Sequence, residues 1–125
     1  MSKRPRILIV EDELMIGLHL KLELEKMGYG VVGPVSTVEG AMAVMAQETI
    51  AAAVLDLQLH GELSLSVAQT MSDRGIPFIF VTGSRVGPMA NSFQGVRILS
   101  KPVNFKKLAT HLEEMCGAGA SGASL

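Results

Sequence analysis

Residues 51–61 read AAAVLDLQLHG, from Ala51 to Gly61. The small and apolar residues before Asp56 form a run that is too short for a helix. The run is typical of a strand buried on both faces, as in a parallel sheet covered by helices. Because an unpaired carboxylate is costly to bury, we expect Asp56 to lie where this strand leaves the core, at the sheet edge where ligands and chemistry are found. Taken alone, however, Asp56 is better explained as a cap of the next helix.

The composition indicates one globular domain. The chain has 125 residues, of which 48% are hydrophobic. Its net charge of −1 offers no electrostatic footprint for nucleic acid, and no apolar run is long enough for a signal peptide or a membrane span. The lone cysteine, Cys116, suits a reducing compartment. We therefore expect a cytoplasmic protein that binds neither nucleic acid nor membranes.

The rest of the chain alternates between expected strands and helices. Besides the strand at 51–56, apolar runs predict strands at residues 7–10, 29–35, 76–81 and 96–99. Helices are expected at residues 13–27, 36–47, 64–73, 88–93 and 104–115, with Ser36 and Asn104 as N-caps. This alternation predicts a doubly wound α/β fold with a parallel five-stranded sheet in the order 2-1-3-4-5. Residues 117–125, rich in Gly, Ala and Ser, are expected to form a flexible tail.

The expected strand order brings several polar side chains to one edge of the sheet. Its switch point lies between the first and third strands, so Asp12 and Asp56 are expected side by side, with Glu11 next to Asp12. Thr82 and Lys101 end the next two strands. Crowded carboxylates suit a hard cation such as Mg²⁺, and a hydroxyl and an ammonium opposite them can hold a phosphoryl group. A carboxylate such as Asp56 can also act as a nucleophile.

Four motifs at these positions resemble the receiver domains of bacterial two-component response regulators. They are Ile7-Leu8-Ile9-Val10-Glu11-Asp12-Glu13, Val54-Leu55-Asp56, Val81-Thr82-Gly83 and Ser100-Lys101-Pro102, in the family's order and spacing. The resemblance implies a (βα)5 flavodoxin-like receiver domain over residues 4–116. Residues 76–83 also resemble the PFxFATGY-like signature of a subgroup of stand-alone receivers, although Val81 replaces the Ala and Ser84 the Tyr.

The resemblance implies a magnesium site built from carboxylates. Asp12, Asp56 and the carbonyl of Gln58 are expected to bind Mg²⁺ directly, and Glu11 through a metal-bound water. His60 is close enough to Asp56 in the sequence to touch this site.

The resemblance also implies which residues handle the phosphoryl group. Asp56 is expected to receive it from a phosphohistidine of a sensor histidine kinase. Thr82 is expected to hydrogen-bond one phosphoryl oxygen, and Lys101 to pair with another. The Lys101–Pro102 peptide is expected to be cis, as in the family.

The same resemblance suggests partners and output. Because the receiver domain takes up the chain, we expect a single-domain response regulator, monomeric or weakly dimeric, that is not a free-standing enzyme. Its output is expected to be a contact with a downstream protein or a phosphorelay to a phosphotransfer partner. Ile98 stands where the family commonly has Tyr or Phe, which makes residues 83–95 the alternative carrier of the signal.

Two other interpretations remain. A pseudo-receiver that serves as a phosphorylation-independent binding module would carry the same residues. An aspartyl-phosphatase normally needs a second Asp two residues after its nucleophile, and Gln58 stands there instead. That difference counts against the turnover of free phosphoesters.

The helix expected at residues 13–27 has two apolar faces. The face assigned to the core holds Ile16, Leu20, Leu24 and Met27. The second face holds Leu14, Met15, Leu18 and Leu22. In the family this helix docks on the helical bundle of the kinase, so docking is one interpretation of the second face. The other is packing against the last helix, near Phe105 and Leu108.

Overall fold

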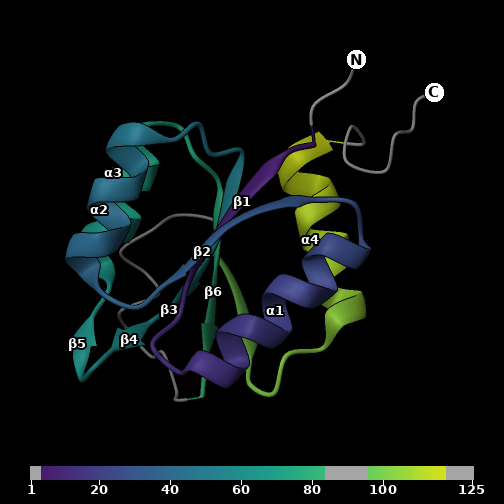
Figure 1. Ribbon diagram of the computed structural model, residues 1–125, viewed down its shortest axis with the longest axis horizontal. Coiled ribbons are helices and arrows are strands. Elements are labelled where there is room, and N and C mark those ends of the chain that lie inside the picture. Colours follow the sequence, from purple (N-terminus) through teal and green to yellow (C-terminus); the bar gives the residue numbers. More distant parts are fainter. Residues whose placement is uncertain (1–3, 84–95, 118–125) are drawn as a thin grey trace.

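Five parallel strands form the central sheet of the computed structural model, which describes residues 4–83 and 96–117 (Figure 1). The strands of this sheet are β1 (Arg6–Val10), β2 (Gly30–Val35), β3 (Ala52–Asp56), β6 (Phe78–Thr82) and β7 (Arg97–Ser100). Their order is β2-β1-β3-β6-β7, which is the predicted order 2-1-3-4-5 when the strands of this sheet are counted along the chain. The doubly wound architecture is therefore confirmed.

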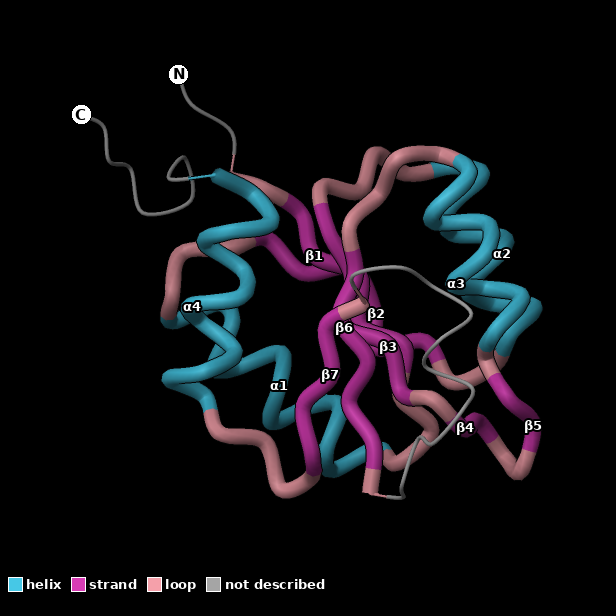
Figure 2. Tube along the Cα trace, turned by 180° about the vertical axis from the view of Figure 1, so that it is seen from behind, coloured by secondary structure: helices cyan, strands magenta, loops and turns pink. Residues whose placement is uncertain are grey.

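Helices cover both faces of the sheet (Figure 2). On one face lie α1 (Leu14–Lys26) and α4 (Phe105–Cys116), and on the other lie α2 (Val38–Gln47) and α3 (Leu65–Asp73). Every described helix and main-sheet strand begins and ends within two residues of its prediction. The helix expected at 88–93 and nearly all of the expected tail lie outside the described residues. Among residues 4–83 and 96–117, no helix combines the length and apolar character needed to cross a membrane.

Strand β1 shows why the first apolar run is uninterrupted. Ile7 and Ile9 pack in the cluster beneath α1 and α4, whereas Leu8 and Val10 pack in the cluster beneath α2 and α3. All four side chains are buried, because successive residues of a strand point to opposite faces. A strand with helices on both sides must be apolar at every position.

Two local features differ from the sequence predictions. The N-cap of α2 is Thr37 rather than Ser36, and its hydroxyl accepts a hydrogen bond of 2.9 Å from Gly40 N. The expected loop after β3 contains a small antiparallel hairpin, formed by β4 (Gln58–Leu59) and β5 (Glu62–Leu63). Its two turn residues, His60 and Gly61, have φ angles of 51° and 80°, as a tight type I′ turn requires.

The predicted N-cap of α4 is confirmed, since Asn104 Oδ1 accepts a hydrogen bond from Lys107 N at 3.0 Å.

The two apolar faces of α1 have different environments. Of the residues assigned to the core, Leu20 and Leu24 are buried, and Ile16 and Met27 pack partly buried against the same cluster. The second face, which we call the α1 patch, is exposed: the exposed fractions are 66% for Leu14, 76% for Met15, 39% for Leu18 and 57% for Leu22. The interpretation that this face packs against the last helix is therefore wrong.

Helix α1 approaches β2 closely where Gly17 meets Pro34. A Cβ atom at position 17 would lie 2.8 Å from Pro34 Cβ and 2.9 Å from Pro34 Cγ. Both distances are below a normal van der Waals contact, and a proline ring cannot rotate away. Glycine at this buried position therefore lets the helix lie against the sheet.

We predict that Gly17→Ala destabilises the protein. Alanine favours a helix over glycine by about 1 kcal/mol, but overpacking costs about 1–3 kcal/mol, so the net loss of stability is expected to reach up to about 2 kcal/mol. Urea unfolding monitored by circular dichroism measures it. Gly40→Ala in α2 is the matched comparison, because its Cβ would meet the Thr37 hydroxyl at 3.1 Å, and a smaller change is expected. A raised stability of Gly17→Ala would contradict the steric argument.

Candidate functional site

The carboxyl ends of four strands form the rim on which the predicted site residues lie. Glu11 and Asp12 follow β1, Asp56 ends β3, Thr82 ends β6, and Lys101 follows β7. The strands pair in register, with Asp56 opposite Val81 and Thr82 opposite Ser100. A cavity of about 290 Å³ opens at this rim, and its lining consists of Asp12, Glu13, Asp56, Gln58, Gly61, Thr82, Gly83 and Lys101.

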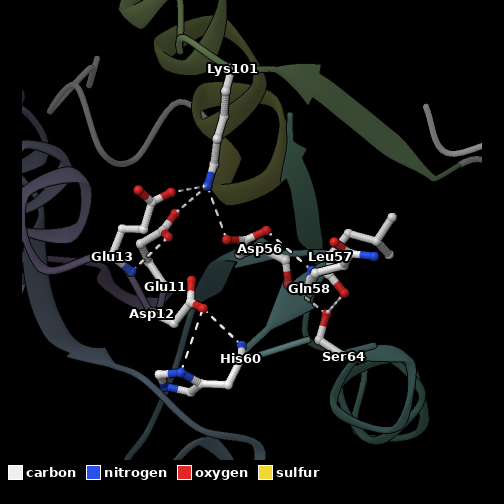
Figure 3. Close-up of polar contacts among 9 residues, drawn as sticks. All are labelled: Glu11, Asp12, Glu13, Asp56, Leu57, Gln58, His60, Ser64 and Lys101. Carbon is white, nitrogen blue, oxygen red and sulfur yellow. Dashed lines mark hydrogen bonds and ion pairs between the residues drawn. The ribbon is translucent and has the colours of Figure 1, made fainter. Parts of the chain in front are cut away.

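Lys101 connects the carboxylates of the rim (Figure 3). Its Nζ lies 3.0 Å from Asp56 Oδ2, 2.9 Å from Glu11 Oε1 and 3.8 Å from Glu13 Oε1. The side chains of Glu11 and Asp56 are almost fully buried, whereas that of Glu13 is 65% exposed. Burial lowers the pKa of Lys101, but its hydrogen bonds to Glu11 and Asp56 outweigh that effect and raise the pKa above its usual value. Lys101 is therefore a cation held by buried carboxylates.

Glu11 is the buried acid of the site. Burial raises its pKa from an ordinary value of 4.5 to about 7, against the opposing effects of hydrogen bonds from Glu13 N and Lys101. The Glu13 amide donates to Glu11 Oε2 at 3.0 Å. The carboxyl group is thus oriented by its own chain and by Lys101, at an electrostatic cost that a bound cation would reduce.

Asp12 faces the solvent side of the cavity and is held by the hairpin. The His60 amide donates to Asp12 Oδ2 at 2.8 Å, and this bond lowers the pKa of Asp12. The His60 ring is more distant, with Nδ1 at 3.8 Å from the same oxygen. In the sequence His60 is close enough to Asp56 to touch the site, and the structure shows a contact with Asp12 that is made mainly by the His60 backbone.

Asp56 is held at both its carboxylate and its carbonyl. The Gln58 amide donates to Asp56 Oδ1 at 3.2 Å, and the Ser64 hydroxyl donates to the Asp56 carbonyl at 2.6 Å. The sequence predicts Ser64 only as the start of a helix and does not indicate this contact. Its signal is weak, because a serine before a helix is normally explained as an N-cap.

Thr82 and Lys101 are joined through the backbone. Thr82 is buried, and its carbonyl accepts a hydrogen bond of 2.9 Å from Lys101 N. The peptide between Lys101 and Pro102 is cis, as expected, and the Gly33–Pro34 peptide is cis as well. Ile98, which stands where receiver domains commonly have Tyr or Phe, pairs with Phe80 and packs partly buried below α2 and α3.

Three carboxylates could hold a metal ion. Glu11, Asp12 and Asp56 each place one oxygen within 4.8 Å of the others. Hard oxygen donors at this spacing suit Mg²⁺, which keeps several waters and takes one or two carboxylates from a protein. The backbone amide of Gln58 donates a hydrogen bond to Asp56. The role of the Gln58 backbone carbonyl as a metal ligand stays a prediction.

We predict that, without metal, Glu11 makes the protein less stable as the pH rises from 5 to 7.5. The folded protein binds this proton more tightly than the unfolded chain, so the free energy of unfolding falls between pH 4.5 and about 7. At about 1.4 kcal/mol per pKa unit, the loss is at most roughly 3–4 kcal/mol. Urea unfolding in EDTA should show a flatter pH dependence for Glu11→Gln.

Asp12→Asn provides the contrast for this measurement. The lowered pKa of Asp12 has the opposite sign: its stabilisation is present above the unfolded pKa and is lost as the pH falls through the folded pKa. Replacing Asp12 should therefore not flatten the slope between pH 5 and 7.5. Equal slopes for wild type and Glu11→Gln would contradict the assignment to Glu11.

Solved structures of other proteins share this fold. SdrG from Sphingomonas melonis Fr1 is 39% identical, with a TM-score of 0.79 over 92% of this chain and 98% of SdrG. The BeF3-activated conformation of SdrG is 37% identical, with a TM-score of 0.76 over 93% and 99%. The receiver domain of a sensor histidine kinase from Pseudomonas aeruginosa PAO1, solved with a magnesium ion in its active-site cleft, is 21% identical, with a TM-score of 0.79 over 92% and 99%, and shows the shared fold alone.

Sequence comparison identifies the family. The uncharacterized transcriptional regulatory protein YbdJ of Bacillus subtilis (strain 168) is 30% identical over 116 residues, which are 88% of this chain and 50% of YbdJ. The chain thus spans half the length of this curated relative. The PFxFATGY subgroup stays a prediction. Residues 7–113 match the model of the response regulator receiver domain, so the chain belongs to this family of two-component signalling domains.

Proposed function

We propose that Asp56 accepts a phosphoryl group from a sensor histidine kinase in a magnesium-dependent reaction. The observation that carries this proposal is the position of Lys101 Nζ, 3.0 Å from Asp56 Oδ2 and 2.9 Å from Glu11 Oε1, at the rim of an acidic cavity. A cation beside a nucleophilic carboxylate is placed to balance the charge that a phosphoryl group adds. Membership of the receiver family supports the same reaction.

The transfer requires little beyond placement and charge balance. An oxygen of Asp56 attacks phosphorus, so an O–P bond forms while the P–N bond of the kinase phosphohistidine breaks. Catalysis of such transfers is almost entirely positioning and electrostatic stabilisation. Lys101 would pair with one phosphoryl oxygen, and the Thr82 hydroxyl would donate to another. The hydrogen bond from Gln58 N would keep the carboxylate of Asp56 oriented during the attack.

The donor set of the cavity fits Mg²⁺. Asp12, Asp56 and the Gln58 carbonyl would bind the ion directly, and Glu11 would act through a bound water. Once bound, Mg²⁺ would neutralise the crowded carboxylates and share the phosphoryl charge. The backbone amide of His60 would keep Asp12 facing the ion.

We further propose that the receiver domain comprises residues 4–116, followed by a tail of 117–125.

The signal would leave through a protein contact or by onward transfer of the phosphoryl group. In this proposal the protein is cytoplasmic, works as a monomer or weak dimer, and does not turn over free phosphoesters. The absence of a second Asp at position 58 supports the last point, because aspartyl-phosphatases use that residue as a general acid.

We predict that Mg²⁺ and acetyl phosphate add one phosphoryl group to the wild-type protein and none to Asp56→Asn. The amide keeps the shape of the carboxylate but is not a nucleophile. Intact mass spectrometry, with and without EDTA, measures the modification. Glu62→Gln, an exposed change on the hairpin, is the control and should be phosphorylated like wild type. A folded wild-type protein that binds Mg²⁺ but takes no phosphoryl group would favour the pseudo-receiver.

We also propose that the α1 patch docks the helical bundle of the kinase. The patch starts at Leu14, directly after Glu13, which lines the cavity. Its four side chains are exposed on the described surface, and contiguous exposed apolar residues mark interaction sites. A bundle seated there would bring its phosphohistidine over the rim.

We predict that Leu18→Glu slows phosphotransfer from the cognate kinase by at least about tenfold, a loss of about 1.4 kcal/mol in docking. Acetyl phosphate should phosphorylate the variant at the wild-type rate, because the substitution does not alter the cavity. Ala43→Glu, which adds the same charge at an exposed position of α2 across the sheet, is the matched control. Kinase transfer to Leu18→Glu at the wild-type rate would rule out docking through this patch.

A further inference from the structure

Ser64 is a buried polar residue at the junction of the hairpin and α3. Its exposed fraction is 0%. The hydroxyl lies 2.6 Å from the carbonyl oxygen of Asp56 and 3.1 Å from that of Leu57, and both contacts are drawn in Figure 3. The Ser64 amide also donates to the Leu57 carbonyl at 2.8 Å. Ser64 therefore bonds the backbone of the proposed phosphoacceptor without touching its carboxylate.

The usual reason for a serine at this position does not apply. Ser64 is the N-cap residue of α3, yet its side chain accepts no capping hydrogen bond from the described backbone of that helix. Thr37 and Asn104, the N-caps of α2 and α4, do accept such bonds. The Ser64 hydroxyl instead donates toward the end of β3, so stabilisation of its own helix does not explain the residue.

The turn formed by residues 56–58 is held from two sides. On one side, the Gln58 amide donates to Asp56 Oδ1 at 3.2 Å, which sets the orientation of the carboxylate. On the other side, the Ser64 hydroxyl bonds the carbonyl of Asp56. If the hydroxyl were lost, the Leu57 carbonyl would keep its bond from the Ser64 amide, but the Asp56 carbonyl would lose its bond from Ser64. The peptide plane after Asp56 would keep the longer bond from Leu57 N to the Val81 carbonyl, at 3.4 Å, but would lose the shorter bond to Ser64. It would therefore be held less firmly, and the backbone amide and carbonyl of Gln58 would be less firmly placed as well.

We propose that Ser64 is a positioning residue that holds the turn of residues 56–58 in the geometry needed for metal binding and phosphoryl transfer. The inference rests on the proposed function of Asp56 and Gln58 and adds a residue that acts through them. Partners of this kind, which orient the groups that bind a metal, typically change affinity or activity by about 10–100-fold when they are lost. Ser64 would act at the lower end of this range, because it holds backbone rather than a ligand side chain.

The test is Ser64→Ala, compared with Ser66→Ala. Ser66 lies two residues further along in α3 and is exposed, so its loss should leave the site unchanged. Calorimetric titration with Mg²⁺ should show about tenfold weaker binding for Ser64→Ala and wild-type binding for Ser66→Ala. In the metal-free protein, NMR should show faster hydrogen exchange of the Gln58 amide only in Ser64→Ala, because its bond to Asp56 Oδ1 is weakened. Phosphorylation by acetyl phosphate should slow about tenfold.

The outcomes separate this inference from the proposed function. A folded Ser64→Ala that binds Mg²⁺ within twofold of wild type and protects its Gln58 amide equally would overturn the positioning role, even if wild type is phosphorylated on Asp56. If wild type takes no phosphoryl group, Mg²⁺ affinity and amide exchange still decide the role of Ser64. Should Ser64→Ala fail to fold, Ser64→Cys keeps the shape and a weak donor. Its affinity should then fall below that of wild type, and equality would overturn the inference.

Discussion

The ion pair network of Lys101 is the constraint on which the site depends. Glu11 and Asp56 are nearly buried, and two carboxylates so close together repel each other unless a cation lies between them. Lys101 Nζ is that cation, within 3.0 Å of both. One ammonium does not balance the carboxylates of Glu11, Asp12, Glu13 and Asp56, so the cavity keeps an excess of negative charge. This excess is what makes a divalent cation a fitting ligand.

The sheet supplies the precision that this balance requires. Because β1, β3, β6 and β7 are parallel neighbours, the residues after their last buried positions meet at one rim. The side chains of β1 alternate between two apolar clusters, so a shift of one residue would exchange its two sets between clusters and turn the acids away. The core therefore determines the position of the acids.

The sequence indicates the parts of the site that follow from strand ends and leaves out those that follow from contacts across loops. The positions of four residues could be predicted because each ends or directly follows an apolar run that indicates a buried strand. These residues are Asp12, Asp56, Thr82 and Lys101. The cap of α2 could not, because Ser36 and Thr37 are both good caps and the first turn of the helix decides between them. The hairpin after β3 was missed because its turn is His60-Gly61 rather than the common Asn-Gly.

The positions that break local rules share one region of the molecule. Ser64 is an N-cap whose hydroxyl turns away from its helix, Glu11 is a buried acid, and Leu14 is an exposed leucine beside the cavity. Each conflict would count against folding if it stood alone, since stable sequences usually agree with their structure at every level. When such conflicts gather around one cavity, function is the expected cause. The energetic cost of each feature is local, whereas the compensating apolar packing lies in the two clusters on either side of the sheet.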